Sequence, residues 1–194
     1  MTDGEIRVEL KIDHGPSSVS GSHLLVAVGR TPNTDALNLG ATGLATDERG
    51  YIPVNGRRET EVADIWALGD ITGAPPFTHT AYDDYRIIRT NLLEGGDATA
   101  DDRILTYVVF IDPQLGRVGL TEDQARQQGH DVRIATLPMS RVARAIEMDE
   151  TRGLMKAVVD AESDRILGAA ILGVEGGEIV SVIKAAMMGD LPWK

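Results

Sequence analysis

Within the segment Ala63–Thr72 (ADIWALGDIT), a short apolar strand is predicted to run directly into Gly69 and Asp70. Gly69 lets a ligand approach the backbone closely, and the carboxylate of Asp70 can accept hydrogen bonds from vicinal hydroxyl groups. This combination suits a sugar-like ligand. A Gly-Asp pair after a strand is also a common simple turn, and that alternative stays open at this point.

A predicted helix begins shortly after this pair, over residues 80–93. Thr78 or Thr80 can cap it, and its free N–H groups and positive dipole end suit an electron-rich carbonyl or an anion. The apolar positions expected on one face are Ala81, Tyr85, Ile88 and Leu92. Capping needs no ligand, and dipole complementarity alone explains Asp83 and Asp84, so we expect these two carboxylates to be structural or solvated.

A third candidate element is the sequence VGRTPNT, in which the apolar run Leu24–Val28 breaks at Gly29. A continuous apolar run predicts a strand covered on both faces. Arg30 then places a cation at the start of a turn. Such breaks are common, so this element by itself favours a purely structural interpretation.

The order of these elements is more specific than any one of them. The segments VAVGRTPNT, DERGYIPV, ADIWALGDIT, FTHTAYDDYRIIRTNLL, YVVFIDPQLGRVGLTEDQAR and GLMKAVVDAESDRILGAAILG follow one another along the chain. This series resembles the C-terminal half of the flavin-dependent pyridine nucleotide-disulfide oxidoreductases, over about residues 5–188. The stretch AYDDYRI is most similar to the mercuric reductase-like branch, and dihydrolipoamide dehydrogenase belongs to the same family.

The resemblance implies roles for particular residues. Asp70 matches the aspartate that binds the ribityl chain of FAD, with Gly69 allowing close approach. Thr78, His79 and Thr80 match the segment whose N–H groups face the flavin pyrimidine edge, where a helix N-terminus stabilises negative charge. Gly29 and Arg30 match the end of the nicotinamide-nucleotide domain, near the cofactors, where Arg30 is expected to contact either FAD or NAD(P)H. The complete enzyme would pass a hydride from NAD(P)H through FAD to a disulfide or a metal ion.

The resemblance also implies three regions. Residues 1–31 would end the nicotinamide-nucleotide domain, residues 32–100 would be the returning segment of the FAD domain, and residues 101–194 would be the dimerisation domain. The fold class is therefore α/β followed by an α+β unit with a mostly antiparallel sheet. Strands are expected at residues 5–12, 24–28, 51–54, 65–68, 104–110, 118–120, 132–137, 154–160 and 166–174, and further helices at 121–128 and 178–188.

Several features of such enzymes are absent from the 194 residues. No two glycines are separated by one residue, so no GxGxxG dinucleotide-binding turn is present. The chain has no cysteine, and none of its four histidines begins an HPxxxE acid-base motif. We therefore predict no catalytic residue and no metal site. We expect the redox dithiol to lie upstream, the dimerisation domain to be truncated at its C-terminus, and the chain alone to be inactive and unable to retain FAD.

The formal net charge of −11 argues against nucleic-acid and membrane-surface partners. We expect a cytoplasmic protein that forms a homodimer through residues 104–194, with a small-molecule or disulfide substrate. We also expect exposed apolar surface at residues 24–28 and 65–68, where neighbouring strands would be missing. An inactive oligomerisation or binding module derived from the same family is the alternative, and a subunit complemented by a separate polypeptide is another.

Overall fold

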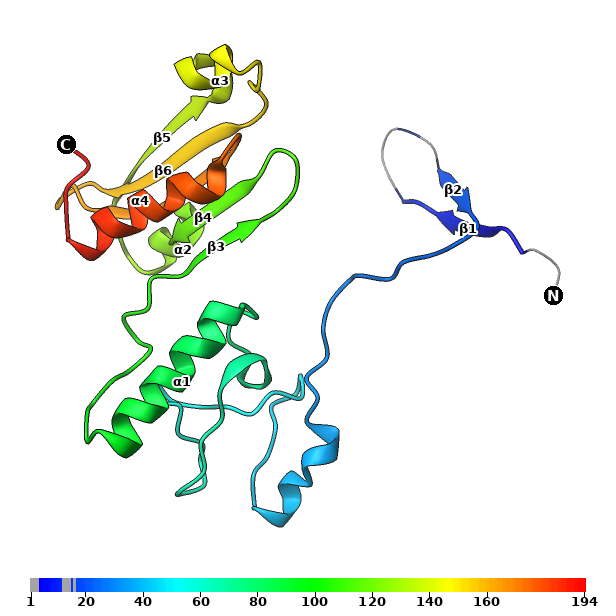
Figure 1. The fold of residues 1–194 in the computed structure, drawn as a ribbon, viewed down its shortest axis with the longest axis vertical. Helices are drawn as coiled ribbons and strands as arrows, with labels where there is room; N and C mark the ends of the chain where they lie inside the picture. The colour runs from blue at the N-terminus through cyan, green and yellow to red at the C-terminus, as the bar shows by residue number, and fades with distance from the viewer. Residues whose placement is uncertain (1–3, 12–14, 16) are drawn as a thin grey trace.

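A computed structural model describes residues 4–11, 15 and 17–194 (Figure 1). Ile12, the last residue of the strand expected at residues 5–12, lies outside the described residues. The elements in chain order are β1 (Ile6–Glu9), β2 (Ser18–Gly21), α1 (Thr78–Leu93), β3 (Thr106–Val109), β4 (Leu115–Gly119), α2 (Glu122–Gln127), β5 (Val132–Pro138), α3 (Ala143–Glu147), β6 (Leu154–Asp160), β7 (Ile166–Leu172) and α4 (Gly176–Met188).

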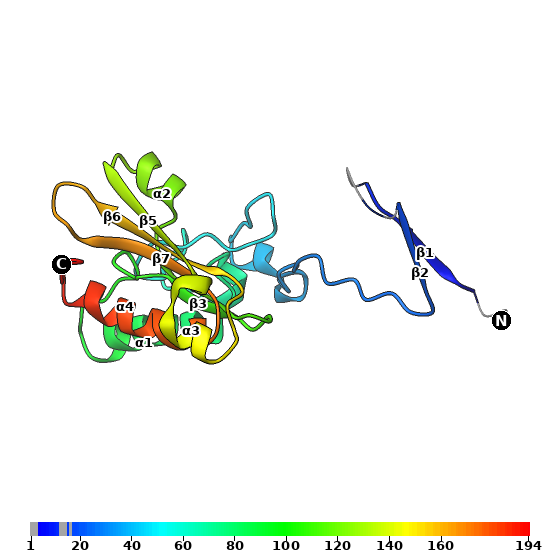
Figure 2. The same ribbon diagram turned by 90° about the horizontal axis from the view of Figure 1, so that it is seen from above.

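The C-terminal unit is built on a five-stranded sheet in the order β3-β4-β7-β6-β5, and every pairing is antiparallel. This confirms the antiparallel α+β unit. Figure 2 shows α4 on one face of the sheet and α2 on the other. Alternate residues of each strand point to opposite faces, so the unit has two small cores. One contains Val118, Ala169, Ile171 and Val180, and the other contains Ala125, Val132 and Val158.

A local capping signal fixes the start of α2, whereas the start of α4 lies at a close contact with β4. The Thr121 hydroxyl accepts the N–H of Gln124 at 3.0 Å, and the Gln124 side chain accepts the N–H of Thr121 at 2.8 Å. This capping box fixes the start of α2. Helix α4 begins at Gly176, two residues before the predicted start, because Gly116 and Gly176 together let the helix end approach β4 closely. A Cβ on Gly116 would lie 2.1 Å from the Gly176 carbonyl oxygen.

The strand prediction for residues 24–28 is wrong. These residues belong to no strand, and Leu25 and Val28 are 88% and 93% exposed. A strand needs neighbouring strands that pair with its backbone groups. Among the described strands, the two that precede this segment in the chain, β1 and β2, pair only with each other. Figures 1 and 2 show this hairpin away from the other elements, joined to them by an extended segment. The predicted exposure of apolar surface here is confirmed.

The segment between residues 32 and 77 contains turns and short 3-10 helices rather than the strands predicted at 51–54 and 65–68. Ile52 donates its N–H to the Ile71 carbonyl at 2.9 Å, and Trp66 makes a single bridge to Glu59. Ile52 and Ala67 are buried, whereas Leu68 is exposed. Apolar surface at residues 65–68 is therefore only partly exposed, because the irregular backbone folds Ala67 inward.

Helix α1 begins at Thr78, and its buried face differs from the predicted one. Thr80, Asp84 and Ile87 are the buried residues, while Tyr85 and Leu92 are exposed. The spacing of four and three residues is helical in both cases, so periodicity alone does not identify the buried stripe. In the described part of the chain, none of the helices has the length and apolar character needed to cross a lipid bilayer.

Candidate functional site

An open cleft of about 830 Å³ brings together three of the residues singled out in the sequence, Gly29, Arg30 and Asp70. Arg30 Nη1 lies 2.8 Å from Asp70 Oδ2, across 40 positions of sequence. Both side chains are at least half exposed, so the pair faces the cleft and water. Arg49 also lines the cleft, with its guanidinium stacked on the Tyr51 ring at 5.2 Å from the ring centroid.

Asp70 is held in a one-turn 3-10 helix that spans Gly69–Thr72. Gly69 has φ +75°, a left-handed conformation that favours glycine, and the Thr72 hydroxyl donates to the Gly69 carbonyl at 2.9 Å. Gly73 ends the turn with the same φ value. The Thr72 hydroxyl and the Gly73 N–H, which donates to the Asp70 carbonyl, thus fix the backbone of the turn, while the Asp70 carboxylate points outward.

The start of α1 is close in sequence but lines a different hollow. His79 and Thr80 border a cleft of about 450 Å³ that also includes Arg86, Arg103 and Lys184. The structure therefore does not place these two residues in the cleft of Arg30 and Asp70. Neither cleft counts Gly69 or Thr78 among the residues that line it.

The predicted capping of α1 by Thr78 or Thr80 is wrong. Phe77 occupies the N-cap position without a side-chain hydrogen bond, and Thr80 lies inside the helix. The Thr80 hydroxyl is buried and has no hydrogen-bond partner among the described residues. Phe77 stacks against His79 and Tyr107, with centroid distances of 5.4 and 5.1 Å, so aromatic packing rather than a polar cap fixes the helix start.

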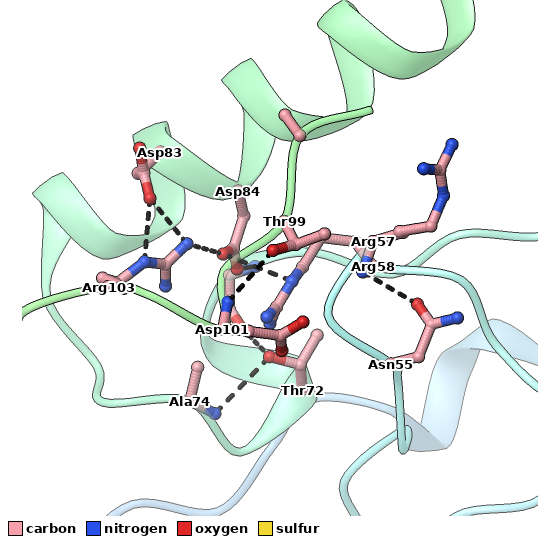
Figure 3. Close-up of polar contacts among 12 residues, drawn as sticks. Asn55, Arg57, Arg58, Thr72, Ala74, Asp83, Asp84, Thr99, Asp101 and Arg103 are labelled. Atoms are coloured by element: carbon pink, nitrogen blue, oxygen red, sulfur yellow. Dashed lines mark hydrogen bonds and ion pairs between the residues drawn. The ribbon is translucent and has the colours of Figure 1, made fainter. Parts of the chain in front are cut away.

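Asp84 is the residue that sequence reasoning missed (Figure 3). Its side chain is fully buried, so of the two expected alternatives, structural or solvated, Asp84 takes the structural one, but through burial rather than through the helix dipole alone. Its Oδ2 accepts the N–H of Gly69 at 3.0 Å, and its Oδ1 lies 2.6 Å from Arg103 Nη2. Arg58 Nε lies 3.7 Å from the same Oδ1. A buried carboxylate requires such partners because desolvation of an unpaired charge costs several kcal/mol.

Asp83 differs from its neighbour in burial and in partners. It is about half exposed, and its Oδ2 accepts Arg103 Nε at 2.8 Å. Arg103 therefore bridges two adjacent carboxylates of α1. The sequence holds only a weak signal for this cluster. Two consecutive aspartates lie on a predicted helix, and Arg103 follows Asp84 by 19 residues and Asp83 by 20. Nothing in that spacing says which aspartate is buried.

Among the histidines in the described ranges, His23 and His130 line neither cleft. His130 Nδ1 is 3.2 Å from Asp160 Oδ2, and His23 is exposed beside Ser22. Hydrogen bonds from Ser163, with a further one from His130, hold the pKa of Asp160 at about 2, below its ordinary value of 3.8. In the part of the chain that the structure describes, no three His, Cys, Asp or Glu side chains converge in a way that could hold a metal ion.

Comparison with known proteins gives the class. Residues 2–84 match the family model for pyridine nucleotide-disulphide oxidoreductase, and residues 105–194 match the model for its dimerisation domain. The chain belongs to the pyridine nucleotide-disulphide oxidoreductase family, and its C-terminal sheet unit is the dimerisation domain of that family.

Particular relatives agree with this assignment. The chain is 43% identical over 190 residues to the probable pyridine nucleotide-disulfide oxidoreductase RclA of Escherichia coli, covering 97% of this chain and 43% of that protein. It is 37% identical to a mercuric reductase of Lysinibacillus sphaericus, covering 95% of this chain and 34% of that protein. The solved Cu(II) complex of the E. coli flavoprotein disulfide reductase RclA superimposes with a TM-score of 0.82 at 42% identity, over 96% of this chain and 43% of that chain. The chain thus spans less than half the length of these relatives.

Proposed function

We propose that this chain forms part of an FAD-dependent NAD(P)H oxidoreductase, in which it supplies one wall of the flavin pocket and the dimer interface. The observation that carries the proposal is the Arg30–Asp70 ion pair. Both residues line the same open cleft as Gly29. The resemblance implies that all three residues lie near the cofactors, which supports the proposal. Two segments that are distant in the sequence meet in this cleft, and the charged groups of Arg30 and Asp70 remain accessible to a ligand.

The donors and acceptors of this cleft fit a flavin dinucleotide. The Asp70 side chain is 51% exposed, so its carboxylate retains accepting capacity for ribityl hydroxyl groups. Arg30 and Arg49 place two guanidinium groups in the cleft of an otherwise acidic chain, which suits a diphosphate. FAD, when bound, would accept a hydride from NAD(P)H and pass electrons to the substrate.

The N–H groups of the first turn of α1 would face the pyrimidine edge of the flavin, through Thr78, His79 and Thr80. The helix has 16 residues and no side-chain cap, so its first-turn N–H groups are available to a ligand carbonyl. The substrate would be a disulfide or a metal ion. One relative is named a mercuric reductase, and another has been solved as a Cu(II) complex, which supports a metal ion as the electron acceptor.

We further propose that the chain forms a homodimer through residues 104–194, and that it functions in the cytoplasm, where NAD(P)H is supplied. Residues 1–31, 32–100 and 101–194 would be the end of the nicotinamide-nucleotide domain, the returning FAD-domain segment and the dimerisation domain. The family-model matches at 2–84 and 105–194 support a division near residue 100.

The test is an NMR titration of the ¹⁵N-labelled chain with FAD, with Asp70→Asn as the variant. The expected result is weak binding, with amide shifts concentrated at residues 29–30, 69–73 and 78–80, and a large reduction of these shifts in the variant. Glu162→Gln, on the turn after β6, is a matched control that removes an exposed carboxylate elsewhere. Shifts scattered over the surface, or unchanged in the Asp70 variant, would contradict the flavin assignment and favour an oligomerisation module.

A further inference from the structure

We propose that Asp84 is a positioning residue for the flavin-facing turn, and that Arg103 couples this turn to the dimerisation domain. Only one part of the inference, that the turn at Gly69 faces a flavin, rests on the proposed function. Its structural part depends on the contacts of the Asp84 carboxylate, which joins three separate segments of the chain: the turn at Gly69, the first half of α1, and the connection that leads into β3 (Figure 3).

The first step concerns the carboxylate itself. Asp84 has no exposed surface, and its two oxygens are used by different segments. Oδ2 accepts the Gly69 N–H, and Oδ1 accepts Arg103 Nη2. A fully buried charge is tolerated only when its partners are fixed, so the position of the carboxylate follows from both contacts together. The Gly69 turn and the Arg103 side chain are therefore linked through one rigid group.

The second step concerns Gly69. Its N–H group belongs to the Leu68–Gly69 peptide, so the hydrogen bond to Asp84 fixes the backbone at the start of the turn that carries the Asp70 carboxylate. Gly69 has φ +75°, and a Cβ there would lie 3.4 Å from the Cβ of Ala81 on α1. That distance is an ordinary van der Waals contact, so the left-handed backbone conformation rather than a lack of space favours glycine at the position whose N–H reaches Asp84.

The third step concerns Arg103. Its side chain is 19% exposed and donates to both Asp83 and Asp84. Two residues later, the Leu105 carbonyl accepts the N–H of Gly119 at 2.7 Å, at the point where β3 joins β4. A displacement of the sheet relative to α1 would therefore pull on Arg103, and through Asp84 on the turn that carries Asp70.

Arg58 gives the cluster a second cation. It has φ +65°, an uncommon conformation for a residue with a side chain, and its side chain is 11% exposed. Its Nε has no hydrogen-bond partner among the described residues, although it lies 3.7 Å from Asp84 Oδ1. Two guanidinium groups thus surround the Asp84 carboxylate. The site holds this carboxylate electrostatically as well as through the hydrogen bond to Gly69.

The experiment measures amide hydrogen exchange at Gly69 by NMR in the full chain, with Asp84→Ala, Asp84→Asn and Asp83→Asn. In Asp84→Ala, exchange at Gly69 should become roughly tenfold to hundredfold faster, because a hydrogen bond to a charged group is lost. In Asp84→Asn, part of the protection should remain, since the amide oxygen can still accept the N–H. Asp83→Asn is the matched control, because it removes an adjacent partner of Arg103 that has no contact with Gly69, and Gly69 exchange should stay within about twofold of the parent.

Amides of β6 and β7 report on the folding of the rest of the chain in each variant. Gly69 exchange that is unchanged in Asp84→Ala, or accelerated equally in Asp83→Asn, would overturn the positioning role. If Asp84→Ala does not fold, the Asp84→Asn and Asp83→Asn pair decides the same question.

A second readout separates the flavin part of the inference from the structural part. On titration with FAD, the parent chain and Asp83→Asn should show the same shift at the Asp70 amide, and Asp84→Ala should lose most of it. Absence of any FAD-induced shift in the parent would contradict the proposed function, while the exchange data would still test the link from Asp84 to Gly69. A normal FAD shift at Asp70 in Asp84→Ala would overturn the positioning role alone.

Discussion

Arg30 and Asp70, 40 positions apart, form an ion pair of 2.8 Å at the mouth of an open cleft, with both side chains at least half exposed. The Arg103–Asp84 pair is shorter, at 2.6 Å, and its carboxylate is fully buried. These two pairs have the same chemistry in different surroundings. Their energetic contributions should therefore differ because water screens one and not the other.

Replacement of each arginine by methionine tests this difference. Arg30→Met should lower the free energy of unfolding by less than about 1 kcal/mol, since exposed ion pairs contribute little. Arg103→Met should lower it by about 3–5 kcal/mol, because a buried carboxylate loses its closest partner. Urea denaturation of the two variants and the parent measures both values. An Arg30 variant that loses as much stability as the Arg103 variant would contradict the burial argument.

The contact between β4 and α4 predicts a glycine that does not tolerate substitution. Gly116→Ala should destabilise the chain by about 1–3 kcal/mol or more, because the new Cβ would overlap the Gly176 carbonyl oxygen at 2.1 Å. Gly40→Ala is a matched control, since nothing lies within 4 Å of its Cβ position. Thermal unfolding should show a lower Tm for Gly116→Ala and little change for Gly40→Ala. Equal effects of the two substitutions would mean that the close approach of α4 to β4 is not required.

Acid should weaken the turn between β6 and β7. Hydrogen bonds from Lys194, Arg133 and Trp193 hold the pKa of Asp164 at about 2, below its ordinary value of 3.8. Because the pKa is lower in the folded chain, the stabilisation is complete above about pH 4 and is lost as the pH falls towards 2. Asp164→Asn should therefore reduce stability at neutral pH and flatten its decline between pH 4 and 2. A parent and variant with parallel pH profiles would exclude this contribution.

Hydrogen exchange should distinguish the two parts of the chain. Amides of residues 24–28, which lie in no strand and are exposed, should exchange at nearly unprotected rates. Amides at the centres of β6 and β7 should be the most protected, because these strands are paired on both sides. Mass spectrometry of peptides from each region measures this contrast. Equal protection of residues 24–28 and of the sheet would show that the N-terminal part folds independently.

The sequence predicts the strands of the C-terminal unit and its helices α2 and α4, but not α3, because the signals for the predicted elements are local. Short apolar-rich runs between turns predict β5 and β6, and Thr121 with Gln124 marks the start of α2. The strand predicted at residues 24–28 fails for the opposite reason. An apolar run becomes a strand only beside other strands, and the run itself does not reveal whether they are present.

The candidate site is only partly predictable. The dipeptide Gly69–Asp70 and the pair Gly29–Arg30 are visible in the sequence, although their approach to one another depends on the fold. The burial of Asp84 is not predictable from the sequence, because an acidic residue in the first turns of a helix is explained equally well by the helix dipole. Its burial follows from the rotation of α1, which places Thr80, Asp84 and Ile87 inward instead of the more apolar stripe.

The central claim is that this chain supplies one wall of a flavin pocket. The most direct test mixes the chain with a second polypeptide that carries the GxGxxG dinucleotide-binding turns of a relative, and then measures flavin absorbance after gel filtration together with NAD(P)H oxidation. We predict that FAD is retained after gel filtration, and NAD(P)H is oxidised, only in the mixture. Asp70→Asn should lower both the FAD content and the rate of NAD(P)H oxidation. Stable retention of FAD by the chain alone, or a mixture whose FAD content does not depend on Asp70, would contradict the claim.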